Sequence, residues 1–139
     1  MSMTRRTLLV AVAVGLSCRG GSERCSHCGM PIDPGSAWRA DLVMVDGTTR
    51  HFDSPRCALT AWRTGHDHPS AMRVLDYYDR RWRDASEVLF VAGSDILGPM
   101  GPDLVPVDRA RAQKFANDHS AGRPLPLAAI TADVVLHLP

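Results

Sequence analysis

Residues 38–65 read WRADLVMVDGTTRHFDSPRCALTAWRTG, and this stretch predicts a hairpin followed directly by a helix. Residues 38–45 and 48–52 are rich in apolar and β-branched side chains, which favours two strands. Between them, Asp46-Gly47 is typical of a hairpin turn, because glycine accepts a positive φ angle at no steric cost. We therefore expect the two strands to pair antiparallel.

The helix is expected to begin without a long loop. Asp53 and Ser54 offer capping side chains, and Pro55 suits the first helical position, where its missing N–H leaves no donor unpaired. The apolar pattern ends near Gly65, a residue that commonly ends helices. The stretch therefore predicts a strand-strand-helix unit, and the fold class is α+β.

The second half of the chain repeats this order of elements. Its predicted first strand, joining loop, second strand and helix are residues 86–93, 94–103, 104–107 and 109–119. Asp108 is expected to cap the helix, in the place that Asp53 has in the first half. We therefore predict two small ββα units, residues 25–80 and 81–139, with chance similarity between short segments as the alternative.

Two segments lie outside this repeated order. Residues 72–78 favour a further strand that crosses towards the second half. Residues 125–138 are expected to form a turn of helix and a last strand.

Residues 1–17 have the features of an export signal. Two arginines precede an apolar run at residues 8–16, far shorter than the roughly 20 residues that span a membrane. A small residue then precedes Cys18, as at a bacterial lipoprotein cleavage site, so Cys18 is the predicted lipid-carrying residue. Residues 18–24, rich in glycine, serine and charge, would form a flexible tether. An N-terminal helix packed on the core is the alternative.

The charge of the chain excludes one class of partner. The formal net charge is +1, and cleavage of the signal would remove two arginines and no acidic residue. A nearly neutral chain does not suit nucleic-acid binding, which needs a basic surface. We expect an exported monomer that is attached to the membrane through its N-terminal lipid.

The cysteines indicate a metal or redox function. If Cys18 carries a lipid, the thiols of Cys25, Cys28 and Cys57 remain, an odd number in a compartment that favours disulfides. At least one thiol is then unpaired, or a metal protects all three.

Residues 25–30 read CSHCGM and narrow the choice of metal. Gly29 lets the backbone turn tightly, so that the sulfur atoms of Cys28 and Met30 can converge on one ion. A thioether is a poor ligand for zinc and a good ligand for copper(I), which is soft and tolerates low coordination. The motif therefore predicts a copper(I) site at Cys28 and Met30, together with Cys25.

Other side chains are weaker candidates. Cys57, in the first turn of the predicted helix, is either a third sulfur ligand or a small buried side chain; the helix dipole there would lower the pKa of its thiol. Met100, in a loop rich in proline and glycine, and His27 are further possible donors, with packing and solvent exposure as their alternatives. Met44 and Met72 are expected in the core.

Two other functions stay open at this stage. A thiol-disulfide oxidoreductase would use Cys25 and Cys28, although Gly29 and the prolines that follow disfavour the helix that usually carries such a pair. A structural zinc site would use Cys25, Cys28, Cys57 and a histidine. We find no general base, activated nucleophile or phosphate loop, and therefore expect a binding protein and not an enzyme.

The motif Cys25-x-x-Cys28-Gly29-Met30 resembles the signature of the NosL family, accessory proteins of nitrous-oxide reductase maturation. The likeness continues at Asp46-Gly47, Phe52-Asp53-Ser54, Cys57, Met100-Gly101, Pro106 and residues 112–122.

This resemblance implies a periplasmic copper(I) chaperone with two ββα-type units and a fold similar to part of organomercurial lyase. It also implies that copper(I) is delivered, through a membrane copper transporter complex, to the apo form of nitrous-oxide reductase or a related cuproenzyme. A lyase acting on mercury–carbon bonds, with Asp53 and Cys57 as members of its site, is a variant suggested only by the fold similarity.

Overall fold

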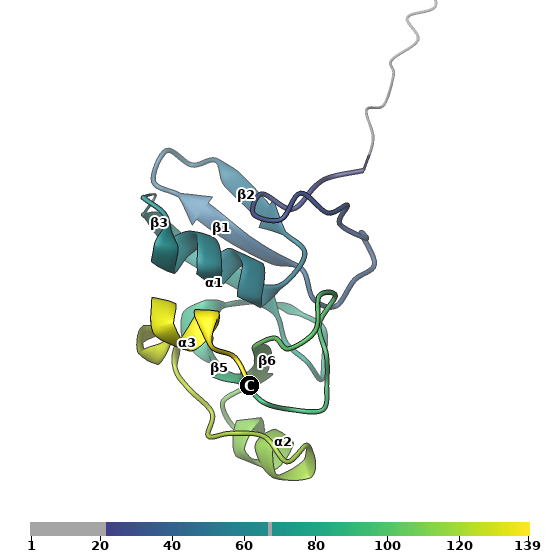
Figure 1. Cartoon of the computed structure of the whole chain (residues 1–139). Helices are drawn as coiled ribbons and strands as arrows, with labels where there is room; N and C mark the ends of the chain where they lie inside the picture. The colour runs from purple at the N-terminus through teal and green to yellow at the C-terminus, as the bar shows by residue number, and fades with distance from the viewer. Residues whose placement is uncertain (1–21, 67) are drawn as a thin grey trace, which may run out of the picture.

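A four-stranded antiparallel sheet dominates the first half of the protein, in a computed structural model that describes residues 22–66 and 68–139. The strand order is β2-β1-β3-β4, and one helix, α1, packs against the sheet (Figure 1). These elements are β1 (Ala40–Met44), β2 (Thr49–Phe52), α1 (Pro55–Thr64), β3 (Pro69–Leu75) and β4 (Trp82–Asp84). The predicted hairpin and helix are thus present.

The second half contains an antiparallel strand pair and two short helices. Its elements are β5 (Val88–Val91), β6 (Val105–Asp108), α2 (Ala112–Asp118) and α3 (Ala132–Leu136), with 3-10 turns at Ala85–Glu87 and Leu127–Ala129. The α+β class and the strand-strand-helix order in both halves are confirmed. β4 was not predicted. It lies beyond residue 80 and nevertheless pairs with β3, so the first sheet extends into the segment assigned to the second unit.

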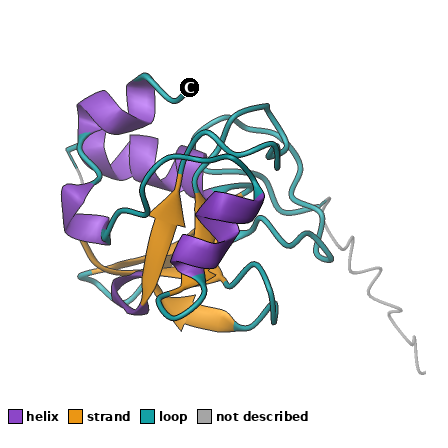
Figure 2. Cartoon of the chain, turned by 90° about the horizontal axis from the view of Figure 1, so that it is seen from below, coloured by secondary structure: helices purple, strands orange, loops and turns teal. Residues whose placement is uncertain are grey.

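One core joins the two halves. Val88 and Phe90 alternate along β5 and face the same buried cluster as Leu59 of α1 and Val135 of α3. The opposite face of the strand pair packs on α2, where Phe115 is buried. Figure 1 shows the resulting layers, with α1 between the large sheet and the β5–β6 pair, and Figure 2 shows the same elements from below, where the layers overlap.

The prediction of a last strand at the end of the chain was wrong. The β-branched residues near the C-terminus favoured a strand, but the segment forms α3 instead. Thr131 caps this helix by accepting a hydrogen bond from the backbone N–H of Val134, and α3 packs against α1. Capping and the burial of Val135 therefore outweigh the intrinsic preference for a strand.

Helix α2 begins later than expected. The side chain of Asp108 accepts a hydrogen bond from the backbone N–H of Ala110, which closes a turn before the helix. α2 begins at Ala112, and its N-cap residue Arg111 makes no capping hydrogen bond with its side chain. The prediction that Asp108 caps this helix was wrong, because its carboxylate stabilises the preceding turn.

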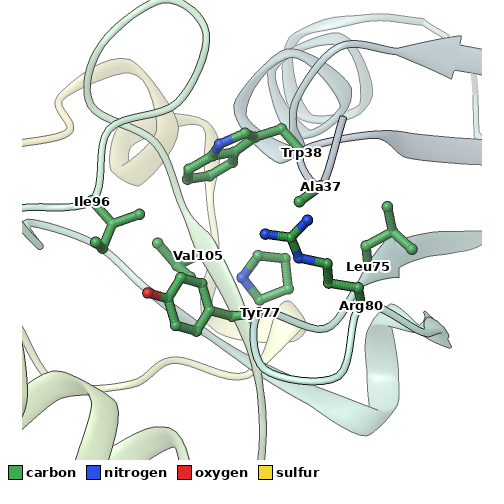
Figure 3. A pocket seen from close by; sticks show the side chains of 8 residues that line it. Ala37, Trp38, Leu75, Tyr77, Arg80, Ile96 and Val105 are labelled. Atoms are coloured by element: carbon green, nitrogen blue, oxygen red, sulfur yellow. The ribbon is translucent and has the colours of Figure 1, made fainter. Parts of the chain in front are cut away.

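A cavity of about 220 Å³ lies where the two halves meet. Figure 3 shows Trp38, Tyr77 and Arg80 around it, and the backbone N–H of Tyr77 donates to the carbonyl of Pro106 at 2.9 Å. Cysteine and methionine are absent from the described lining of this cavity, so the predicted metal ligands lie elsewhere.

Within residues 22–66 and 68–139, no helix is long and apolar enough to cross a membrane. The predicted signal at residues 1–17 and the predicted lipid site Cys18 lie outside the described residues.

Candidate metal centre

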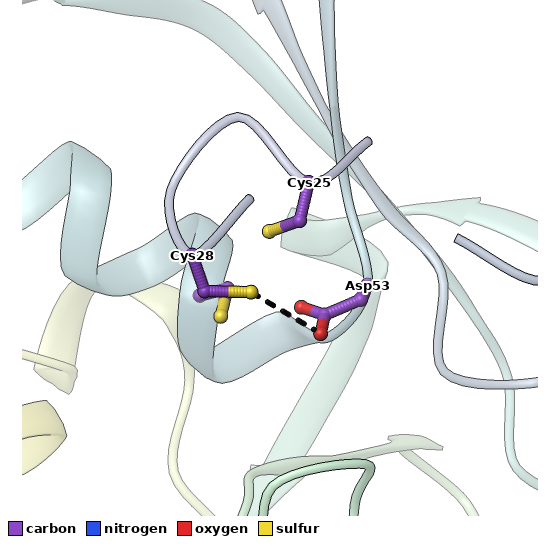
Figure 4. Close-up of side chains that lie close together, drawn as sticks. Cys25, Cys28 and Asp53 are labelled. Carbon is purple, nitrogen blue, oxygen red and sulfur yellow. Dashed lines mark hydrogen bonds between the residues drawn. The ribbon is translucent and has the colours of Figure 1, made fainter. Parts of the chain in front are cut away.

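The Cys-x-x-Cys-Gly-Met segment forms a closed loop. The backbone N–H of Cys25 donates to the carbonyl of Met30 at 2.8 Å, and that of Gly29 donates to the carbonyl of Cys25 at 3.0 Å. Gly29 has a φ angle of 76°, which a residue with a Cβ rarely adopts, so the turn depends on glycine as predicted. The loop brings the sulfur atoms of Cys25 and Cys28 towards Asp53 (Figure 4).

Backbone and side-chain contacts fix this loop to the first sheet. The N–H of Ser26 donates to the carbonyl of His51 in β2 at 2.9 Å. The His51 ring in turn lies 2.8 Å from Asp41 and 3.2 Å from Glu23. Cys25 is only 3% exposed, so the loop inserts its first thiol into the core and does not lie free on the surface.

The start of α1 supplies two further groups, the carboxylate of Asp53 and the thiol of Cys57. Ser54, and not Asp53, is the N-cap residue, and its hydroxyl accepts a hydrogen bond from the N–H of Cys57 at 3.3 Å. Because Ser54 performs the capping, the carboxylate of Asp53 is free to face the thiols. Cys57 lies in the first helical turn, as predicted, and is buried.

Three thiols and one carboxylate therefore converge. One donor atom from each of Cys25, Cys28, Asp53 and Cys57 lies within 4.8 Å of the others. The Sγ of Cys28 donates to Oδ2 of Asp53 at 3.5 Å, the contact drawn in Figure 4. All three cysteines are free thiols. The sequence indicated the three cysteines, whereas it assigned Asp53 to the helix cap and placed it beside Cys57 only in the lyase variant.

Burial controls the protonation of these thiols. It raises the pKa of Cys28, and the backbone N–H of Met30 opposes this by stabilising the thiolate. Burial, aided by the neighbouring Asp53, also raises the pKa of Cys57. The expectation that the helix dipole lowers the pKa of Cys57 was therefore wrong, since desolvation of the thiolate outweighs the dipole. An incoming metal ion must displace these protons.

Two methionines border the cluster on its open side. Met30 and Met100 are 52% and 57% exposed, and both line a cavity of about 120 Å³ together with Asp53. Met100 also lines an adjoining cavity of about 250 Å³ with Cys28 and His27. Met100 and His27 were weaker candidates in the sequence, and both line this cavity together with thiols of the cluster. By contrast, Met44 and Met72 pack in or against the core, as predicted.

A buried aspartate attaches the loop of Met100 to α1. Oδ1 of Asp103 accepts a hydrogen bond from the backbone N–H of Arg56 at 2.8 Å, and the Arg56 guanidinium donates to the carbonyl of Pro102. A Cβ atom at Gly98 would lie 2.7 Å from a carboxylate oxygen of Asp103, so only glycine allows this approach. Burial raises the pKa of Asp103 to about 6. The sequence placed Asp103 at the end of a loop and gave no signal for this role.

Together these features define a class: a small α+β protein whose two halves jointly present clustered thiols, a carboxylate and exposed thioethers. The chain belongs to the NosL family, whose model matches residues 20–135. Among solved structures it resembles the crystal structure of the copper chaperone NosL from Shewanella denitrificans, with a TM-score of 0.70 and 20% identity over 80% of this chain and 91% of that chain. At this identity the likeness establishes the shared fold. No curated protein gives a significant sequence match.

Proposed function

We propose that this chain is a copper(I) carrier, with a site made of sulfur atoms from both halves of the fold. The observation that carries the proposal is that two exposed thioethers line cavities shared with members of the cluster of thiols and carboxylate. Met100 lines one cavity with Cys28 and Cys57, and Met30 lines the other with Asp53. Thiolate and thioether donors together favour copper(I), because soft ligands select soft ions. Membership of the NosL family and the copper chaperone of the same fold support this choice.

Cys28 is the central ligand in this proposal. It is the only one of the three clustered thiols that is partly exposed. Cys28 and Cys57 both line the cavity of Met100, whereas the buried Cys25 does not. Met30 is two residues away from Cys28 on the tight Gly29 turn. Cys28, Met30 and Met100 form the outer donor set, and the two buried thiols can join it from within.

Exposure of the thioethers suits transfer of the ion. A recipient's cysteine, methionine or histidine can enter the open side, share the ion and then take it as the weaker thioether bonds break. The protein acts by ligand exchange and is proposed as a carrier, not an enzyme. A thiol-disulfide oxidoreductase is disfavoured, since Cys25 and Cys28 lie on a loop without a helix beginning there.

The place of action is proposed from the sequence and the family. The chain is exported to the periplasmic side, attached to the membrane by a lipid on Cys18, and delivers copper for maturation of nitrous-oxide reductase or a related cuproenzyme. Its partners are a copper transporter complex or the apo-cuproenzyme itself. If Cys18 carries the lipid, Cys18→Ala moves the protein from the membrane fraction to the soluble fraction, while wild type stays with the membrane.

Anaerobic titration with copper(I), in competition with a chromogenic copper(I) chelator, tests the binding step. Cys18→Ser serves as the background, because it removes the thiol that lies outside the described residues. We expect one tight equivalent, weakened at least about 10-fold by Cys28→Ser, since even loss of a residue that only supports a ligand costs about 10- to 100-fold. Failure of the background protein to compete with the chelator would rule out a copper carrier.

A further inference from the structure

Asp53 is a buried carboxylate that the protein leaves poorly satisfied. It is 6% exposed, and its Oδ1 atom is fully buried without a hydrogen-bond partner among the described residues. Its Oδ2 atom accepts the weak S–H donor of Cys28 at 3.5 Å, and the other neighbour of the carboxylate is the thiol of Cys57, an equally weak donor. Buried polar atoms are nearly always hydrogen-bonded, so this carboxylate needs an explanation.

Helix capping does not supply that explanation, because Ser54 caps α1. Copper(I) does not supply it either. A carboxylate oxygen is a hard donor, and the soft ion prefers the thiols and thioethers that surround it. Zinc(II) and similar borderline divalent ions, in contrast, accept both thiolate and carboxylate ligands and favour four donors in a tetrahedron.

We infer that Cys25, Cys28, Asp53 and Cys57 form a four-donor site for a borderline divalent cation such as zinc(II), a second metal-binding mode that shares thiols with the copper(I) site. The four donor atoms lie within 4.8 Å of one another. Sulfur atoms around a tetrahedral zinc ion are about 3.8 Å apart, given a Zn–S distance of about 2.3 Å. The cluster therefore has to contract by only about 1 Å when the ion enters.

Binding of a divalent cation in this mode releases protons and gives the buried carboxylate a partner. The entering cation displaces the three thiol protons to solvent and gives the Oδ1 atom of Asp53 the partner that it lacks. Neither Met30 nor Met100 takes part, since thioethers are poor zinc ligands. Cys28 belongs to both modes, so a divalent ion at this site and copper(I) exclude each other.

Cobalt(II) is the probe, because it occupies zinc sites and tetrahedral thiolate ligation gives it strong visible absorption. The reduced chain in the Cys18→Ser background is titrated anaerobically and compared with Asp53→Asn. We expect a tetrahedral spectrum in the parent and an affinity at least about 10-fold lower in Asp53→Asn. Asp33→Asn is the matched control, because it removes an exposed carboxylate from the same region without touching the cluster.

The two metal modes are separated by crossed variants. Met30→Leu and Met100→Leu should keep the cobalt(II) affinity and lose copper(I) affinity. Asp53→Asn should lose cobalt(II) affinity and keep the copper(I) affinity. A cobalt(II) affinity that Asp53→Asn leaves unchanged, or a weak octahedral spectrum in the parent, would overturn the four-donor site without affecting the copper(I) carrier. Failure of copper(I) binding alone would leave the four-donor site intact.

Zinc-edge X-ray absorption of the Cys18→Ser parent gives a test that needs no variant at Asp53. The expected first shell holds three sulfur atoms and one oxygen atom. A shell with imidazole nitrogen, or with sulfur alone, would contradict a role for Asp53, even if Asp53→Asn failed to fold.

Discussion

The sulfur of Met30 is the residue-scale feature that separates a copper(I) site from a zinc site. Its side chain is half-exposed and is not needed to fill the core, whereas Met72 is fully buried. Methionine usually contributes by filling gaps between apolar side chains. An exposed methionine two residues after Cys28, lining a cavity with Asp53 of the cluster, is better explained by its sulfur than by its bulk.

Met30→Leu tests the sulfur separately from the bulk. We expect copper(I) affinity to fall at least about 10-fold, with stability changing by less than about 0.5 kcal/mol because the position is on the surface. Chelator competition and denaturant unfolding measure the two quantities. Met44→Leu, a half-buried methionine outside the site, is the control. Equal copper(I) affinity in both variants would mean that Met30 is not a ligand.

At this scale the sequence predicted the thiols better than the oxygen atoms. The Cys-Gly-Met spacing was sufficient for Cys25 and Cys28, because their convergence is local. Asp53 was named beside Cys57 only for the lyase variant and was not assigned to the metal site, because two adjacent residues can both cap a helix, and the sequence does not say which of them does. Asp103 escaped prediction because its partner at Arg56 is 47 residues away.

The N-terminus of α1 is the element on which the site depends. Its first turn carries Cys57, its cap leaves Asp53 free, and the N–H of Arg56 holds Asp103 from the second half. Disturbing this one helix end should therefore affect both the stability of the fold and the arrangement of the thiols.

Ser54→Ala removes the cap of α1. We expect it to lower the free energy of unfolding by about 1 kcal/mol, within the range of about 0.5–2 kcal/mol for loss of such a cap. Thr64→Ala, at the exposed last position of the helix, should cost less than about 0.5 kcal/mol. Urea unfolding monitored by circular dichroism compares the two. Equal costs would show that Ser54 does not cap the helix in solution.

Asp103 makes the contact between the loop of Met100 and α1 sensitive to pH. Its folded pKa of about 6 lies above the ordinary value of 3.8, so the protonated form favours the folded state. This contribution is fully present below about pH 3.8 and is lost as the pH rises through about 6. The amide of Asp103→Asn retains an acceptor for the N–H of Arg56 and does not titrate.

The difference in unfolding free energy between wild type and Asp103→Asn should therefore change with pH. Relative to the variant, wild type should lose about 3 kcal/mol between pH 4 and pH 7, from about 1.4 kcal/mol per unit of pKa. Denaturant titrations at several pH values measure this, and taking the difference cancels the titration of other carboxylates. Parallel pH profiles for the two proteins would contradict a raised pKa.

Helices and strands were predictable from the sequence where capping and packing favoured the same element as the intrinsic preference of the residues. This was so for the β1–β2 hairpin and for α1. It was not so for the segment of α3, because its β-branched residues favour a strand, while burial of Val135 against α1 requires a helix. Packing partners of this kind are distant in sequence, so local pattern alone gave the wrong element.

On the scale of the whole molecule, the two halves share one core. Leu104, next to β6, is completely buried in the cluster that also holds Phe52 and Leu59 of the first half. Met100 thus lines a cavity with Cys28 and Cys57 of the first half because the halves are packed together. The repeated element order was visible in the sequence, but this shared core was not, since strand patterns do not say which faces meet.

Leu104→Ala should destabilise the entire fold. We expect a loss of about 2–5 kcal/mol, the usual cost of truncating a buried leucine, and a single cooperative transition as in wild type. Trp62 and Trp82 lie in α1 and β4, and Trp38 packs where the two halves meet. Tryptophan fluorescence therefore reports on the first half and on this junction, while circular dichroism reports on both halves. Two separate transitions would show that the halves unfold independently.

The central claim is that copper(I) is held by sulfur alone, from both halves of the fold. Copper-edge X-ray absorption of the copper(I)-loaded chain, in the Cys18→Ser background, tests it most directly. We predict a first shell of sulfur atoms only, with one sulfur fewer in Met100→Leu. An imidazole signal, as His27 would give, or a shell unchanged by Met100→Leu would contradict the claim.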